Sequence, residues 1–180
     1  MHTIGVDVRI VPLGLEHLRQ VLDLGYEVFD VACKPYTSWS LTSVAEHVDS
    51  GDNACFVALD GDLVVGFVLG SITFELREDW AYLEWIAVRP GHQGQGIARR
   101  LLEACCEMLF AAGAARVVTD VEGSNTASAT LMRRNGFIPA VTVTLFERSN
   151  PETAGAAAPI SGLPRRPLIR SGRLTGDHRP

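Results

Sequence analysis

The fold of this chain is decided by residues 83–100, which read LEWIAVRPGHQGQGIARR. The mostly apolar run that ends at Val88 predicts a strand over 80–88, and the Pro90-Gly91 turn marks its end. A glycine-rich loop follows, and from Gly96 onward apolar residues recur at helical spacing, which predicts a helix. A helix N-terminus carries unpaired N–H groups and a partial positive charge, so this strand, turn and helix predict a site for a diphosphate.

The glycines at positions 94 and 96 let the backbone approach an anion that a side chain would block. Two familiar phosphate-binding templates nevertheless fail. The nucleotide P-loop needs Lys and then Ser or Thr after its second glycine, where this chain has Ile97 and Ala98. The dinucleotide fingerprint needs a third glycine, where Arg99 stands.

The flanking sequence predicts further strands and helices in a regular order. Apolar residues alternate or recur at helical spacing, and Gly, Pro, Asn and Asp separate these runs. The full order is β-α-α-β-β-β-α-β-α-β, which predicts a mixed α/β sheet with an antiparallel first half and a β-α-β crossover in the second. Ser40 or Thr42 is expected to cap the second helix. The other elements are strands at 6–10, 54–59, 63–69, 116–121 and 141–146, and helices at 15–29, 40–48 and 125–135.

Length and composition predict one domain over residues 1–150 and a tail over 151–180. A chain of 180 residues is long enough to bury one core. The last stretch is rich in Pro, Gly, Ala and Arg and has little to bury, so we expect a disordered extension, with a docking peptide at 164–170 as the alternative. No apolar run approaches the roughly 20 residues that span a bilayer, and no secretory signal is evident at the start. We therefore expect a cytoplasmic protein.

Cysteine spacing and charge exclude several classes of partner. Cys33, Cys55, Cys105 and Cys106 lack the paired spacing of a zinc site, and we expect small buried thiols in a reducing compartment and no metal. The last 30 residues carry a net charge of +3 and the first 150 a net charge of −8. An acidic body argues against nucleic acid as a partner and suits a cationic amine.

Three segments together resemble one family. Residues 93–98, Gln-Gly-Gln-Gly-Ile-Ala, resemble the Q/R-x-x-G-x-G/A loop of the GCN5-related N-acetyltransferase (GNAT) superfamily. Residues 86–90, Ile-Ala-Val-Arg-Pro, stand where that family has an I-A-V-x-P strand end, and residues 123–137, GSNTASATLMRRNGF, resemble its S-N-x-x-A-x-x-L-Y-x-x-x-G-F segment. The similarity spans residues 6–148. It implies the GNAT fold, splayed between the fourth and fifth strands, and transfer of an acetyl group from acetyl-CoA onto an amine.

The resemblance also implies which residues hold the coenzyme. The backbone of the strand end would hold the acetyl and pantetheine end, and the glycine loop would wrap the diphosphate. Asn125 either contacts the coenzyme or only caps its helix, and Met132 replaces the Tyr that is the family's usual general acid, so that Tyr26, Tyr36 or water would have to substitute. The implied coenzyme-binding residues are Ile86, Ala87, Val88, Gln93, Gly94, Gln95, Gly96, Ile97, Ala98, Arg99, Asn125 and Met132.

An amine that is protonated at neutral pH must lose a proton before it attacks a thioester. Strict strand alternation puts Glu84 on the same face as Ile86 and Val88, among apolar neighbours that would raise the pKa of its carboxyl group. We therefore predict Glu84 as the general base, with Asp120 as the second candidate. The resemblance implies that the Val88 N–H stabilises the oxyanion. No cysteine lies in the three motifs, so we expect direct transfer without an acyl-enzyme.

The sequence leaves the amine acceptor open. The resemblance assigns acceptor specificity to residues 14–50 and to the loop before 80–88, where Glu75, Glu78 and Asp79 are acidic. Residues 34–40, KPYTSWS, weakly resemble the ribosomal-protein alanine N-acetyltransferase branch, which favours a peptide or protein amine. An aminoglycoside, a polyamine or an amino acid stays open, as do a longer acyl group, a homodimer and a noncatalytic acetyl-CoA sensor.

Overall fold

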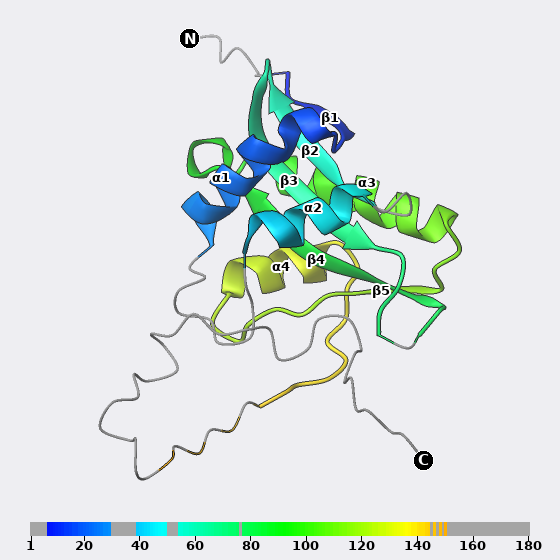
Figure 1. The fold of residues 1–180 in the computed structure, drawn as a ribbon. Helices are drawn as coiled ribbons and strands as arrows, with labels where there is room; N and C mark the ends of the chain where they lie inside the picture. Colours follow the sequence, from blue (N-terminus) through cyan, green and yellow to red (C-terminus); the bar gives the residue numbers. More distant parts are fainter. Residues whose placement is uncertain are drawn as a thin grey trace.

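The computed structural model describes residues 7–29, 39–49, 54–75 and 77–144, and beyond these Phe146, Arg148 and Asn150 (Figure 1). Strands and helices follow one another nearly as predicted. The tail over 151–180 and Cys33 lie outside the described residues. The elements are β1 Arg9–Pro12, η1 Leu15–His17, α1 Leu18–Val28, α2 Leu41–Asp49, β2 Phe56–Asp60, β3 Leu63–Ser71, β4 Trp80–Val88, η3 Pro90–His92, α3 Ile97–Ala111, β5 Arg116–Val118 and α4 Thr126–Arg134.

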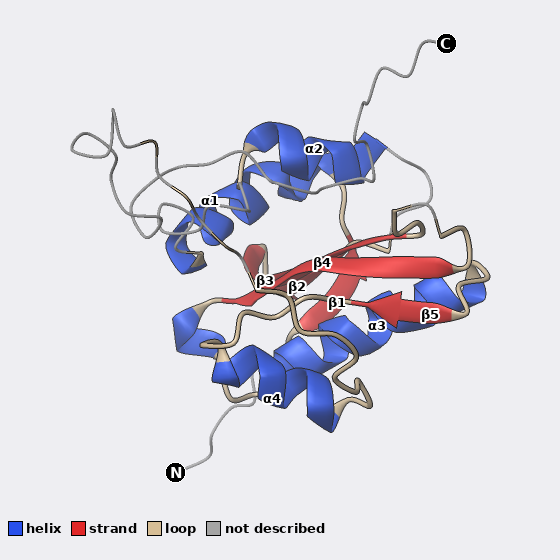
Figure 2. Cartoon of the chain, turned by 90° about the horizontal axis from the view of Figure 1, so that it is seen from below, coloured by secondary structure: helices blue, strands red, loops and turns tan. Residues whose placement is uncertain are grey.

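The five strands form one mixed sheet in the order β1-β2-β3-β4-β5. The first four are antiparallel and β5 runs parallel to β4, so the predicted antiparallel half and crossover are confirmed. Helices α1 and α2 cover one face of the sheet, and α3 and α4 cover the other (Figure 2). Each face has its own apolar cluster, one with Leu24 and Phe67 and one with Leu101 and Leu83.

Strand β5 pairs only with the beginning of β4. Trp80–Tyr82 pair with Arg116–Val118, and within the described chain no strand pairs with Leu83–Val88 on that side. This confirms the predicted splay of the sheet. The carboxyl half of β4 therefore has an open edge.

A β-bulge at Glu84 changes which face the side chains of β4 reach. Leu69 pairs with Trp85 and Gly70 pairs with Leu83, so Glu84 is an extra residue in the ladder. Before the bulge Leu83 packs in the cluster under α3, whereas after it Trp85 packs in the cluster under α1 and α2. The strict alternation assumed from the sequence is wrong across this point.

Trp39 packs between helix α1 and strands β3 and β4. Its indole is 4% exposed, and its Nε1 donates a hydrogen bond to the carbonyl oxygen of Leu22 on α1 at 2.9 Å. Gly25 interrupts the apolar pattern of α1 because a Cβ there would lie 2.0 Å from the indole carbon Cε2. The missing side chain is thus what lets α1 lie against Trp39.

Most predicted strands differ from the structure in their bounds, and the strand predicted at 116–121 ends at Val118, so that Asp120 lies beyond it. The first begins at Arg9 and not at position 6, and Val6 lies outside the described residues. The predicted strand at 141–146 is wrong: its described residues form no strand, and Val141, Val143 and Phe146 are 84%, 87% and 88% exposed. Alternating apolar residues form a strand only where a sheet edge and a core receive them, and here neither does.

Candidate functional site

The open half of β4 presents backbone groups to a ligand. The N–H of Arg89 donates to the carbonyl oxygen of Val65 on β3 at 2.8 Å. Backbone groups of an antiparallel strand alternate in direction, so those of Val88 and Ile86 point away from β3, toward the side from which β5 has diverged. The Val88 carbonyl oxygen accepts a hydrogen bond from Gln93 Nε2 at 3.0 Å. The Gln93 side chain therefore fixes the start of the loop, and the Val88 N–H faces the open edge.

The loop after β4 has the shape that an anion requires. Gly94 and Gly96 have φ of 75° and 77°, in the left-handed region that favours glycine. A Cβ at either position would meet nothing within 4 Å, so the space beside them is open. Gly96 is the N-cap of α3, no side chain caps that helix, and its first bond runs from the Arg100 N–H to the Gly96 carbonyl oxygen. The free N–H groups of the first turn and the open space fit a diphosphate.

The other loop residues have their side chains engaged or solvated. Ile97 and Ala87 are 2% and 5% exposed in the two cores, so that only their backbones reach the site. Arg99 Nε donates to Glu103 Oε1 at 2.7 Å along α3, while Gln95 is exposed and Ala98 partly buried. The predicted role of these positions in an anion site would therefore fall to their main-chain N–H groups, and it stays a prediction.

The two predicted residues near α4 have structural partners. The Asn125 side chain accepts a hydrogen bond from the Ser128 N–H at 3.0 Å and so caps α4, as the alternative interpretation expected. Met132 is 5% exposed in the cluster under α3, which makes it a packing residue of the core. A role for either residue in holding the coenzyme stays a prediction.

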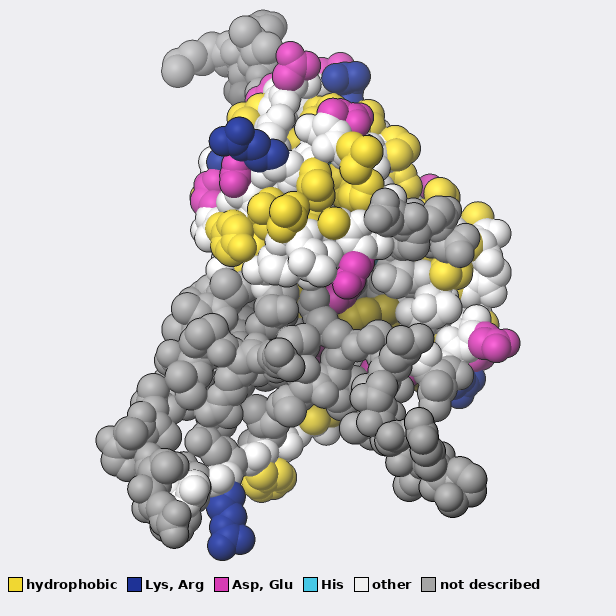
Figure 3. Space-filling view, viewed as in Figure 1, with side chains coloured by type: hydrophobic (Ala, Val, Ile, Leu, Met, Phe, Trp, Pro, Cys, Tyr) yellow, Lys and Arg dark blue, Asp and Glu magenta, His cyan; other side chains and the backbone are white. Residues whose placement is uncertain are grey.

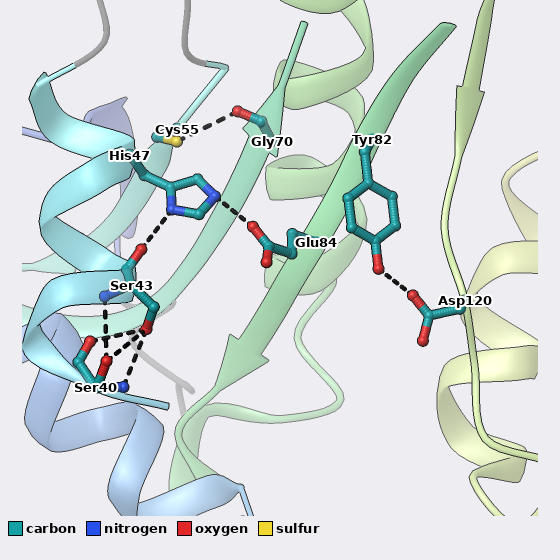
Figure 4. A network of polar contacts seen from close by, with 8 residues as sticks. All are labelled: Ser40, Ser43, His47, Cys55, Gly70, Tyr82, Glu84 and Asp120. Atoms are coloured by element: carbon teal, nitrogen blue, oxygen red, sulfur yellow. Dashed lines mark hydrogen bonds and ion pairs between the residues drawn. The ribbon is translucent and has the colours of Figure 1, made fainter. Parts of the chain in front are cut away.

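Glu84 points toward α2, away from the face that carries Ile86 and Val88 (Figure 4). Its Oε2 lies 2.6 Å from Nε2 of His47, and the two side chains are 9% and 7% exposed. The expectation that Glu84 shares a face with Val88 is corrected by the bulge. Glu84 still sits beside the open edge, so it approaches this edge from the side of α1 and α2.

His47 is a site residue that the sequence analysis missed. It lies on α2 with its Nδ1 2.7 Å from the carbonyl oxygen of Ser43, one turn earlier. Its position three residues after the buried Val44 places an ionisable side chain on the apolar face of the helix. This spacing is the signal from which the sequence could have identified His47. Only the fold shows which carboxylate His47 contacts.

Asp120 lies on the opposite side of the split, two residues after β5. The hydroxyl of Tyr82 donates a hydrogen bond to Oδ1 of Asp120, and this contact joins β4 to the chain beyond β5 (Figure 4). Asp120 is exposed, whereas Glu84 is enclosed. The structure thus places both predicted bases beside the diverging strands. Each has a different partner, which is His47 for Glu84 and Tyr82 for Asp120.

The described cysteines have raised thiol pKa values. Burial raises the pKa of Cys55 to about 12 and that of Cys106 to about 11, and it also raises the pKa of Cys105. Thiols of this kind are protonated at neutral pH and are poor nucleophiles. No cluster of three or more metal-ligating side chains occurs among the described residues, and none of their helices is long and apolar enough to cross a membrane.

Two acidic side chains of the segments to which the resemblance assigns acceptor specificity, Asp79 and Glu27, are already paired. Arg77 holds Asp79 through two hydrogen bonds of 2.9 Å, and Arg89 contacts Glu27 of α1. Asp30 and Tyr36 lie outside the described residues, and Trp39 belongs to the core. Acidic steering by these groups is therefore reduced.

Comparison with known proteins identifies the family. Residues 22–137, more than half of the chain, match the Acetyltransferase (GNAT) family. N-alpha-acetyltransferase 30 of Schizosaccharomyces pombe is 28% identical over 134 residues, which cover 72% of this chain and 83% of that protein. The ribosomal-protein-S18-alanine N-acetyltransferase of Escherichia coli superposes with a TM-score of 0.60 at 25% identity, covering 74% of this chain and 79% of that chain.

A further structural match shows the same fold at lower identity. The aminoglycoside N-acetyltransferase AAC(6')-Iy in complex with CoA superposes with a TM-score of 0.67 at 20% identity, covering 82% of this chain and 99% of that chain. Together with the open edge of β4 and the anion-binding loop, these matches show that the chain belongs to the acetyltransferase (GNAT) family, as an N-acetyltransferase whose acyl donor is acetyl-CoA.

Proposed function

We propose that this enzyme acetylates the α-amine of a peptide or protein. The observation that carries the proposal is the position of Glu84, an enclosed carboxylate beside the open edge of β4. A relative named as an N-alpha-acetyltransferase, which aligns over 72% of the chain, supports this acceptor class. An α-amine has a pKa near 8, against about 10.4 for Lys, so the transfer of its proton to a carboxylate costs less free energy.

Coenzyme binding and acceptance of the amine proton are assigned to groups on different sides of the sheet. The N–H groups of residues 94–99 would hold the diphosphate, and the backbone of Ile86 and Val88 would hold the pantetheine and acetyl end. The bound coenzyme supplies a thioester whose thiol, with a pKa near 8.5, is a tolerable leaving group. Glu84 accepts the proton of the amine from the other side, and the Val88 N–H donates to the carbonyl oxygen as negative charge develops there.

The surface over α1 and α2 suits an uncharged stretch of peptide. Tyr26 and Leu41 are each 54% exposed there. On the described part of the face shown in Figure 3, hydrophobic side chains lie over these helices, and acidic and basic side chains are interspersed. This distribution offers contact to apolar side chains and no large field of one sign to attract a polycation. It favours a peptide over a polyamine or an aminoglycoside.

The acceptor is tested by thiol release from acetyl-CoA with four amines. A peptide with a free N-terminus is compared with the same peptide blocked at its N-terminus but carrying Lys, with spermidine and with an aminoglycoside. We expect turnover with the free peptide and acetyl on its α-amine by mass spectrometry. Faster turnover of spermidine or the aminoglycoside would overturn the acceptor class.

A noncatalytic sensor is the second candidate, because Met132 replaces the family's usual Tyr. The same assay separates it from an enzyme. Acetyl-CoA binding by calorimetry without product on any of the four amines would favour the sensor. Loss of about 100-fold or more of kcat in Glu84→Gln, with unchanged coenzyme binding, would support Glu84 as the base.

A further inference from the structure

The contact between His47 and Glu84 contains one shared proton. A carbonyl oxygen only accepts hydrogen bonds, so His47 Nδ1, 2.7 Å from the Ser43 carbonyl oxygen, must carry a hydrogen. Nε2 and the carboxylate oxygen at 2.6 Å cannot both present lone pairs to each other. A proton therefore lies between them, and the pair is either imidazolium with carboxylate or imidazole with carboxylic acid.

The charged form of the pair carries no net charge of its own. Among the described residues drawn in Figure 4, the Cys55 thiol from the segment before β2 lies near the pair, and the Tyr82 hydroxyl, which is bound to Asp120, lies along β4. Cys55 donates to the carbonyl oxygen of Gly70 at 3.6 Å, and its thiol stays protonated because burial raises its pKa to about 12. A neutral thiol adds no charge, so the imidazolium and the carboxylate compensate each other within the enclosed site.

We propose that His47 is the positioning residue of the reaction: its imidazolium holds Oε2 of Glu84 and keeps the carboxylate ionised, so that the carboxylate can accept the proton of the amine. This inference rests on the proposed role of Glu84. The first proton of the ammonium group passes to the Glu84 carboxylate; the amine nitrogen then bonds to the acetyl carbon as the C–S bond breaks. The second N–H proton goes to the thiolate, and Glu84 returns its proton to water.

The pH dependence of kcat/KM follows from this arrangement. The acid limb, which is the fall of kcat/KM at low pH, reports protonation of Glu84 in the free enzyme. An adjacent positive charge lowers a carboxyl pKa, whereas burial raises it. His47→Gln keeps a hydrogen-bond donor but removes the positive charge of His47, so the effect of burial on the Glu84 carboxyl is opposed less. The acid limb then moves to higher pH by about one unit or more.

The kinetic experiment compares full-length wild type, His47→Gln and Glu46→Gln with acetyl-CoA and the peptide that is turned over. Glu46 is the exposed neighbour on α2 and serves as the matched control. We expect the acid limb to shift in His47→Gln and to stay in place in Glu46→Gln. A purely structural role of His47 would lower kcat/KM equally at every pH, and that result would overturn the proposal.

A second readout needs no acetyl transfer. In ¹⁵N spectra of the imidazole rings at pH 7.5, we expect both nitrogens of His47 to be protonated in wild type, about one unit above the usual histidine pKa of about 6.5. In Glu84→Gln we expect a neutral ring with the proton on Nδ1. A neutral His47 in wild type would overturn the proposed imidazolium, even if peptide acetylation were found. Failure of every amine as a substrate would instead overturn the proposed function and leave this result standing.

Discussion

Gly96 combines a left-handed backbone with a position at the first turn of α3. Its missing side chain leaves the space beside the helix N-terminus open. We expect Gly96→Asp to weaken CoA binding by at least about tenfold in calorimetry. Two like charges about 4 Å apart repel by roughly 1 kcal/mol in water and about 4 kcal/mol near a protein surface, and each 1.4 kcal/mol is tenfold in affinity.

The matched control for this substitution is Gly61→Asp. Gly61 in the β2–β3 turn has a φ of 59° and also has nothing within 4 Å of a Cβ, so the backbone strain is comparable. We expect its CoA affinity to equal that of wild type. Equal affinities of the two variants would contradict the anion site at α3.

At the scale of the element, α2 is capped by Ser40, the residue that precedes it. The Ser40 hydroxyl accepts a hydrogen bond from the Ser43 N–H at 3.2 Å, and the Ser40 N–H donates to the Ser43 hydroxyl at 3.0 Å. We expect Ser40→Ala to lower the free energy of unfolding by about 0.5–2 kcal/mol in urea titrations. Thr42→Ala is the control because Thr42 is exposed within the helix, and it should change stability by less than about 0.5 kcal/mol. The reverse order would assign the cap to Thr42.

The bounds of strand β4 could be predicted from the sequence, but its bulge could not. Its bounds, Trp80–Val88, match the prediction residue for residue, because a β-rich run and a Pro-Gly turn are local signals. The bulge at Glu84 depends on how the strand is paired with β3, and no local pattern marks it. One extra residue turned Glu84 toward α2 and gave it His47 as a partner. The residue predicted as the base was thus found in the sequence, but its face and partner were not.

At the scale of the molecule, residues 141–144 lie outside both cores. Val143 is 87% exposed, whereas Val57 of β2 is fully buried. We expect Val143→Thr to change the free energy of unfolding by less than about 0.5 kcal/mol, and Val57→Thr to lower it by about 1–3 kcal/mol through a buried hydroxyl. Urea titrations of the two variants measure both values. Similar losses in the two would show that residues 141–146 pack in solution as a strand.

The sequence by itself determined the family, the order of the first nine elements, the open split between β4 and β5, and the glycine loop at the head of α3. The order of the elements and the glycine loop follow from short-range periodicity and turn residues, whereas the family and the split follow from the resemblance that three short motifs carry. Only the tertiary structure decided the face of Glu84, its proton partner on α2, the contact between Tyr82 and Asp120, and the absence of a strand at 141–144. Those features depend on pairing and packing between segments distant in the chain, and the free energy of such contacts has no signature in local sequence.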